Sequence, residues 1–141
     1  MDSSCEDDIM ESQSRKGKVY EEFVHKFLKG TIVSGFQDYY DIENKRCVYE
    51  VKGARVYHTD QKGRARIGRY QIIVDNHKKF KELADAANKE PKYVFVLSIG
   101  GRKVFKTMSW EIVGKMMICE GKLTKRTDDK EVCHINLKSI W

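Results

Sequence analysis

The stretch Asp41-Ile-Glu-Asn-Lys-Arg-Cys-Val-Tyr-Glu-Val-Lys52 decides the fold of this chain. Its pattern predicts a tight β-hairpin in which residues 39–42 turn back onto residues 47–52. Asn44 is a typical turn residue, and a two-residue turn at Asn44-Lys45 makes the numbers of opposed residues sum to 89. The register of this hairpin determines which side chains share a face.

Strand geometry then sorts the side chains of the hairpin onto two faces. Because successive residues point to opposite faces, Glu50 and Lys52 project together while Val51 projects into a core. The predicted register puts Asp41 across from Val48, on the face of Glu50 and Lys52. The other face is expected to be an apolar layer made of Tyr40, Ile42, Cys47, Tyr49 and Val51.

The face that carries Glu50 and Lys52 indicates a chemistry. A carboxylate beside an amine, with a second carboxylate from the neighbouring strand, is what metal-assisted cleavage of a phosphodiester needs. The acids would hold Mg²⁺ through hard oxygen ligands. Lys52 would position or help deprotonate a water, or stabilise the charge of the phosphorane. The alternative is an amphipathic strand on which Lys52 only pairs with Glu50.

The segment after this strand is strongly basic. Residues 53–69 are expected to form a loop rich in glycine and arginine, in which Asp60 is the one acid. The forked guanidinium of arginine suits contacts with phosphate. The candidate phosphate-binding residues are Arg55, Lys62, Arg64, Arg66 and Arg69.

The charge of the whole chain supports a polyanionic partner. The net charge is +6, yet residues 1–13 carry five acids and no Lys or Arg. Residues 14–141 therefore hold all 27 bases against 16 acids, a net charge of +11. A body this basic suits a nucleic acid. The alternative is that the lysines only keep the surface soluble.

Length and periodicity predict one domain. Residues 1–13 are expected to be a flexible acidic tail, and residues 14–141 a single domain. Helices are expected at 17–29, at 75–88 and after a cap at Ser109, and strands at 31–36, 70–74, 93–99, 104–106 and 132–137, with Gly100-Gly101 as a hairpin turn. This order is that of an α/β fold with a central mixed β-sheet flanked by helices.

Composition predicts a soluble intracellular protein. The longest apolar run, Tyr93–Leu97, is far too short to span a membrane, so no membrane partner is expected. The N-terminus opens with acids and shows no secretory signal. The four cysteines form no C-x-x-C pair, so we expect free thiols in a reducing cytoplasm.

Three motifs together resemble a known family. The basic segment Arg15–Glu21 opens a helix, Asp41 follows, and Glu50-Val-Lys52 comes before the basic loop. Over residues 14–99 this arrangement resembles the PD-(D/E)xK nuclease superfamily, and is most similar to its archaeal Holliday-junction resolvase branch. The chain departs from the pattern because no proline precedes Asp41. The resemblance implies a restriction-endonuclease-like core and a homodimer.

The resemblance also implies roles for individual residues. Asp41 and Glu50, with the carbonyl of Val51, would hold Mg²⁺, for which Mn²⁺ could substitute. Glu21 would assist from the first helix, and Lys52 would orient or activate the attacking water. The family habit of an acid followed by two apolar residues favours Asp38 in place of Asp41. Both aspartates therefore remain candidates, because a β-bulge could bring Asp38 onto the same face.

These observations favour a Mg²⁺-dependent DNA endonuclease that is selective for DNA structure. Two alternatives share the same fold. One is a site-specific restriction endonuclease, and the other is a nucleic-acid-binding module without turnover. A third alternative is an interaction protein whose acids form only salt bridges.

Overall fold

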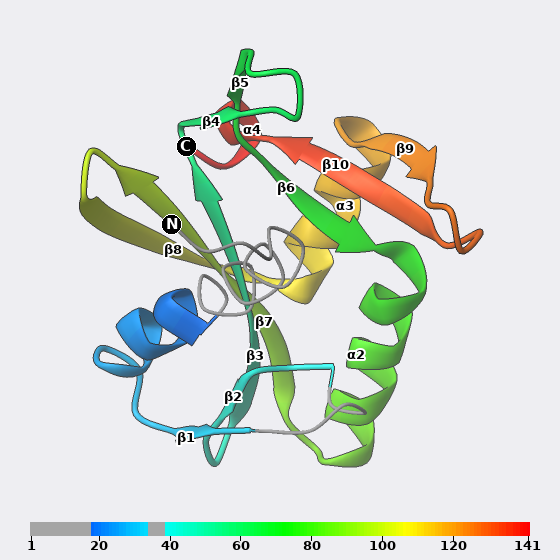
Figure 1. The fold of residues 1–141 in the computed structure, drawn as a ribbon. Coiled ribbons are helices and arrows are strands. Elements are labelled where there is room, and N and C mark those ends of the chain that lie inside the picture. Colours follow the sequence, from blue (N-terminus) through cyan, green and yellow to red (C-terminus); the bar gives the residue numbers. More distant parts are fainter. Residues whose placement is uncertain (1–17, 34–38) are drawn as a thin grey trace.

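The computed structural model describes residues 18–33 and 39–141, except for the side chain of His58 (Figure 1). The expected tail at 1–13 and the alternative ligand Asp38 lie outside these residues. A first helix covers residues 18–25. The elements that follow are β1 (Thr31–Ile32), β2 (Ile42–Glu43), β3 (Cys47–Arg55), β4 (Tyr57–Thr59), β5 (Ala65–Ile67), β6 (Arg69–Ile73), α2 (Val74–Ala86), β7 (Glu90–Ile99), β8 (Arg102–Ser109), α3 (Trp110–Cys119), β9 (Lys122–Lys125), β10 (Glu131–Asn136) and α4 (Leu137–Ile140).

The strands form a mixed central sheet and two smaller sheets. The central sheet has the order β1-β2-β3-β7-β8, in which β3 and β7 are parallel and the other neighbours are antiparallel. A second sheet has the order β6-β10-β9, and β4 pairs with β5 alone. The chain between β3 and β7 passes through the β4–β5 hairpin, β6 and α2. The prediction of an α/β fold with a mixed sheet is confirmed.

The core lies on both faces of the central sheet. On one face, Val48 and Ala54 of β3 belong to a buried cluster with Tyr93 and Phe95 of β7, which α2, α3 and the second sheet cover. On the other face, Cys47, Tyr49, Val94 and Val96 pack with Val24 of the first helix. Figure 1 shows that helix on the opposite side of β3 and β7 from α2 and α3. Helices therefore flank the sheet on both sides, as the sequence predicted.

Several local predictions are confirmed in detail. The apolar run at 93–99 lies in β7, where Val94, Phe95 and Val96 are fully buried. Gly100 and Gly101 both have positive φ, at 51° and 84°, and form the turn into β8. The Ser109 side chain accepts a hydrogen bond from the Ile112 N–H at 3.2 Å and caps α3 as expected.

The prediction of a loop at 53–69 is wrong. Strand β3 continues to Arg55, and the rest of the segment forms the β4–β5 hairpin and the start of β6. Ala54 is buried in the core, so β3 extends beyond the charged residues that seemed to end it. Strand β9 and helix α4 were also not predicted. Every residue of β9 is exposed, so it carries no hydrophobic alternation to reveal it.

The predicted register of the β2–β3 hairpin is wrong by two residues. Ile42 pairs with Tyr49 and Glu43 with Val48, so the opposed numbers sum to 91. The Asn44 N–H donates to the Cys47 carbonyl at 3.0 Å, so the two-residue turn lies at Lys45-Arg46, one residue later than predicted. The side-chain oxygen of Asn44 accepts hydrogen bonds from the N–H groups of Arg46 and Cys47 and stabilises this turn. An even shift keeps every side chain on its predicted face.

One residue of the expected apolar layer lies elsewhere. Ile42, Cys47, Tyr49 and Val51 share one cluster, as expected. Tyr40 instead packs against the cluster on the opposite face of the sheet, where its ring lies 6.2 Å from the ring of Phe80. Tyr40 lies outside β2, whose first residue is Ile42, so strand alternation does not govern the direction of its side chain.

Candidate functional site

Asp41 lies at the edge of β3, immediately before the first residue of β2. Its backbone N–H donates to the Tyr49 carbonyl at 2.7 Å, and its carboxylate accepts from the Val51 N–H at 2.8 Å. The side chain of Asp41 therefore continues the pairing of β3 beyond the start of β2. Because the N–H and C=O of one strand residue point to the same side, the Val51 carbonyl also faces this edge.

Glu50 projects to the face of β3 that carries Val48 and Ala54, next to Lys52. The residue as a whole is half-buried, but its carboxyl group is buried. Burial raises the pKa of Glu50 well above its ordinary value, and the charge of Lys52 opposes this rise. A hydrogen bond with Asp41 and the charge of that residue raise the pKa further.

Glu21 reaches the same place from the first helix. Burial raises its pKa to about 8, and a hydrogen bond with Asp41 and the charge of Asp41 add to the effect. A hydrogen bond between two carboxyl groups requires a proton on one of them. Asp41 is thus the shared neighbour of Glu21 and Glu50, and the three carboxyl groups surround the edge of β3. The structure brings together the four side chains that the sequence singled out for catalysis.

Close packing fixes the first helix against β3. A Cβ atom added at Gly53 would lie 2.1 Å from the ring of Tyr20, so only glycine lets the ring rest on the strand. Tyr20 is the neighbour of Glu21 in the helix, and Gly53 is the neighbour of Lys52 in β3. This contact holds the helix at the distance that brings Glu21 to Asp41.

The neighbouring strand contributes polar residues that the sequence did not reveal. Tyr93 of β7 lies directly beside Glu50 in the parallel ladder. Burial raises the pKa of the Tyr93 hydroxyl, and the charge of Glu50 adds to the rise. The Tyr93 hydroxyl is hydrogen-bonded to Nδ1 of His77 at 2.7 Å. His77 is stacked on Trp110 at 4.3 Å. The only signal in the sequence was a tyrosine within an apolar strand, which reads as packing.

The oxygen atoms at the edge of β3 are of the kind that a hard divalent cation prefers. Carboxylates that raise one another's pKa gain most from a bound cation, because its charge offsets their repulsion. Among residues 18–33 and 39–141, no three His, Cys, Asp or Glu side chains form a ready three-ligand metal site. The donor set that fits is Asp41 and Glu50 with the Val51 carbonyl, and Glu21 close by.

A cleft with a volume of about 1350 Å³ begins at Tyr20 and Gly53, the sequence neighbours of Glu21 and Lys52. The lining of the cleft includes neither the three acids nor Lys52. Three of the five predicted phosphate-binding residues, Arg55, Arg66 and Arg69, line the cleft. Its far wall comes from Asn136, Leu137 and Lys138 at the C-terminal end of the chain. Arg64 and Lys62 lie outside the lining, on the turn of the β4–β5 hairpin.

The arginines of the hairpin are held by the one acid near them. Nε of Arg66 and Nε of Arg64 lie 3.0 and 3.3 Å from Oδ2 of Asp60. Both arginine side chains remain more than half exposed. These exposed ion pairs contribute little stability, so they orient the guanidinium groups without removing them from solvent.

Comparison of the chain with protein-family models, with curated proteins and with solved structures found no match. In the described part of the chain, no helix is both long enough and apolar enough to cross a membrane.

Proposed function

We propose that this chain is a Mg²⁺-dependent DNA endonuclease that hydrolyses phosphodiester bonds. One observation carries the proposal: Glu21, Asp41 and Glu50 meet at the edge of β3, beside Lys52. The arginine-lined cleft begins at Tyr20 and Gly53, the sequence neighbours of Glu21 and Lys52. The likeness of residues 14–99 to PD-(D/E)xK nucleases supports the same function.

In the proposed reaction, the metal-binding residues and Lys52 have different roles. A bound Mg²⁺ would polarise a phosphate oxygen and lower the pKa of a coordinated water. Asp41 and Glu50 would hold it, with the Val51 carbonyl, and the Val51 N–H fixes the orientation of the Asp41 carboxylate. The Lys52 ammonium would orient the water and stabilise the negative charge that builds up on the oxygens of the phosphorane.

Glu21 takes a proton in this scheme. With a pKa of about 8, it is protonated at neutral pH while no cation is bound. Binding of a cation lowers that pKa and releases the proton. Glu21 can then act as an acceptor for the proton of the attacking water, within the same group of carboxylates.

The DNA is held in the cleft and along its rim. Arg55, Arg66 and Arg69 face the cleft and provide the positive charge that a phosphate backbone requires. By its likeness to the resolvase branch, the enzyme prefers branched DNA, with the four-way junction as its substrate.

The test is to incubate the protein with linear, supercoiled, flapped and four-way DNA, each with Mg²⁺ and with EDTA. We expect cleavage with Mg²⁺ or Mn²⁺ and fastest cleavage of the four-way form. Ca²⁺ should support binding without turnover. Full activity in excess EDTA would refute the metal mechanism. Tight binding without cleavage of any form would instead show a nucleic-acid-binding module.

A further inference from the structure

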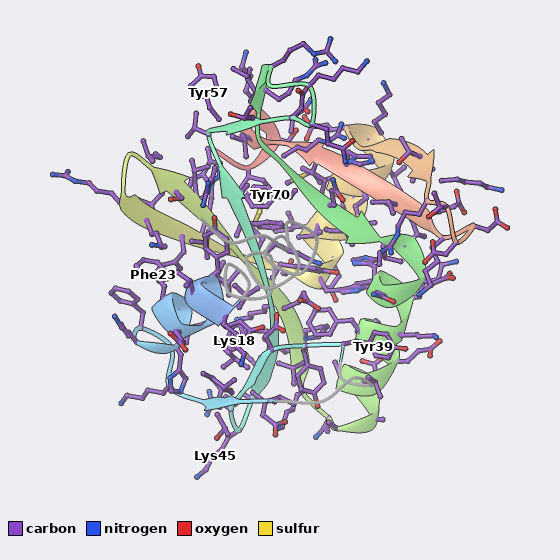
Figure 2. The ribbon with its side chains drawn as sticks, in the orientation of Figure 1. Lys18, Phe23, Tyr39, Lys45, Tyr57 and Tyr70 are labelled. Carbon is purple, nitrogen blue, oxygen red and sulfur yellow. The ribbon has the colours of Figure 1, made fainter. Side chains whose placement is uncertain are left out.

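The β4–β5 hairpin is a two-stranded ribbon with an exposed apolar pair at its base. Tyr57 and Ile67 are directly opposite one another, so their side chains share a face. They are 67% and 66% exposed, more than any other large apolar side chain in the described residues except Ile118. Figure 2 shows Tyr57 at the outer margin of the molecule. Exposure of such a pair indicates a surface that a partner covers.

The tip of this ribbon is ordered by Asp60. Its Oδ1 accepts from the N–H groups of Lys62 and Arg64, and its backbone carbonyl accepts from the Gly63 N–H. Gly63 has a φ of 75°, a left-handed conformation that glycine adopts without strain. Arg64 and Arg66 contact Asp60 through Nε, which leaves the terminal nitrogens of both guanidinium groups to contact phosphates.

The base of the ribbon is fixed to the strand that carries the acids. The Gly68 N–H donates to the Val56 carbonyl at 2.8 Å, and the Val56 N–H donates to Ser98 of β7 at 3.3 Å. A Cβ atom at Gly68 would lie 1.7 Å from the Arg55 carbonyl oxygen, so the two backbones touch. From Lys52 to Tyr57 is five residues, or at most about 17 Å along the strand.

A duplex groove is the partner that this arrangement fits. The major groove admits a two-stranded β-ribbon, and apolar side chains contact thymine methyl groups or wedge between base steps. Basic side chains on the same segment complement the phosphates that border a groove. The ribbon also forms part of the cleft wall, through Arg66 and Ile67, so a duplex in the cleft would meet it.

We propose that the β4–β5 hairpin enters a groove of duplex DNA, with Tyr57 and Ile67 against the bases and Arg64 and Arg66 on the phosphates. At about 3.4 Å per base pair, the contact lies within about five base pairs of the phosphate that the acids cleave. This inference rests on the proposed function, because it places the ribbon relative to the cleavage site.

The first experiment measures duplex binding against salt concentration in the Glu50→Gln background, so that cleavage does not interfere. Tyr57→Ser with Ile67→Ser should weaken binding about tenfold or more and leave the salt slope unchanged, because neither side chain neutralises a phosphate. Arg64→Ala with Arg66→Ala should lower the slope by about 1.8. Ile99→Ser is the matched control, because it changes an exposed apolar residue of another hairpin.

The second experiment locates the contact. Hydroxyl-radical footprinting should show that the positions released by the Tyr57 and Ile67 changes lie within about five base pairs of the cut made by the parent. The variants of Tyr57, Ile67, Arg64, Arg66 and Ile99 should melt like the Glu50→Gln protein that carries them, because these five side chains are exposed.

Two results would overturn the inference. One is a Tyr57 and Ile67 variant that binds duplex like the parent, and the other is a lost footprint remote from the cut. A parent that binds through the ribbon but never cleaves would contradict only the proposed nuclease function.

Discussion

The Asp41 carboxylate accepts a hydrogen bond from the Val51 N–H at 2.8 Å, so an acidic side chain takes the place of a strand at the edge of β3. Burial raises the pKa of both Glu21 and Glu50, and the same carboxyl group of Asp41 raises both further. Asp41 therefore has two roles, as a partner of the backbone and as the centre of the acidic group.

Substitutions at Asp41 should separate these roles. Asp41→Ala leaves the part-buried Val51 N–H without a partner and should lower the free energy of unfolding by about 1–3 kcal/mol. Asp41→Asn keeps an oxygen acceptor and should unfold close to the parent. Both should lose cleavage. Urea unfolding beside a plasmid-nicking assay measures the two effects, and equal stability of the two variants would contradict the backbone role.

The acidic group predicts how stability depends on pH when no cation is present. Folded Glu21 keeps its proton up to a pKa of about 8, while an unfolded glutamate loses it near 4.5. Between these values the folded state binds more protons, so stability is greatest below pH 4.5 and falls as the pH rises towards 8. Burial of Glu50 acts in the same direction.

Melting temperatures in EDTA at several pH values measure this effect. Glu21→Gln should flatten the decline, and Glu22→Gln, on the exposed side of the same helix, should not. Added Mg²⁺ should raise the melting temperature more at pH 8 than at pH 5, because protons compete with the cation. Identical profiles for the parent and Glu21→Gln would show that Glu21 does not titrate with the group.

Lys52 can be tested apart from folding. Lys52→Met keeps the stem of the side chain but removes the charge, so cleavage should fall by about 10²–10³ while the melting temperature stays near that of the parent. The pKa of Glu50 should rise further, because Lys52 lowers it now. Lys92→Met on β7 is the control. A Lys52→Met protein that cuts like the parent would remove Lys52 from the mechanism.

A substitution at Val51, on the same strand as Lys52, should affect stability. Its side chain packs in the cluster with Tyr49 and Val24, so Val51→Asp would bury a charge and cost several kcal/mol. The melting temperature should therefore fall for Val51→Asp and stay near that of the parent for Lys52→Met. Equal melting of the two variants would contradict the assignment of faces on β3.

Sequence periodicity was sufficient to predict which side chains share a face of β3. It was not sufficient to predict which residues of β2 pair with that strand. Alternation alone puts Glu50 and Lys52 together, and any even error in register preserves this. The position of the turn depends on hydrogen bonds that the Asn44 side-chain oxygen accepts from the Arg46 and Cys47 N–H groups, and a residue pattern does not show these. The β4–β5 hairpin was missed because its strands are three residues long and mostly charged or exposed.

Glu21 and Asp41 come into contact through tertiary packing, which a local sequence pattern does not predict. The helical pattern of the sequence shows only that Glu21 lies at the margin of the apolar stripe of the first helix. The distance to β3 depends on the contact between Tyr20 and Gly53, two residues far apart in the sequence. Likewise, Tyr93 becomes a neighbour of Glu50 only through the parallel pairing of β3 with β7.

The most direct test of the central claim is the rate of plasmid nicking in Mg²⁺ for the parent, Glu50→Gln and Glu90→Gln. Glu90 is an exposed glutamate at the start of β7, so it controls for loss of one acid near the sheet. We predict that Glu50→Gln binds DNA at least as tightly as the parent but does not nick, while Glu90→Gln does both like the parent. Nicking by Glu50→Gln at the rate of the parent would contradict the account.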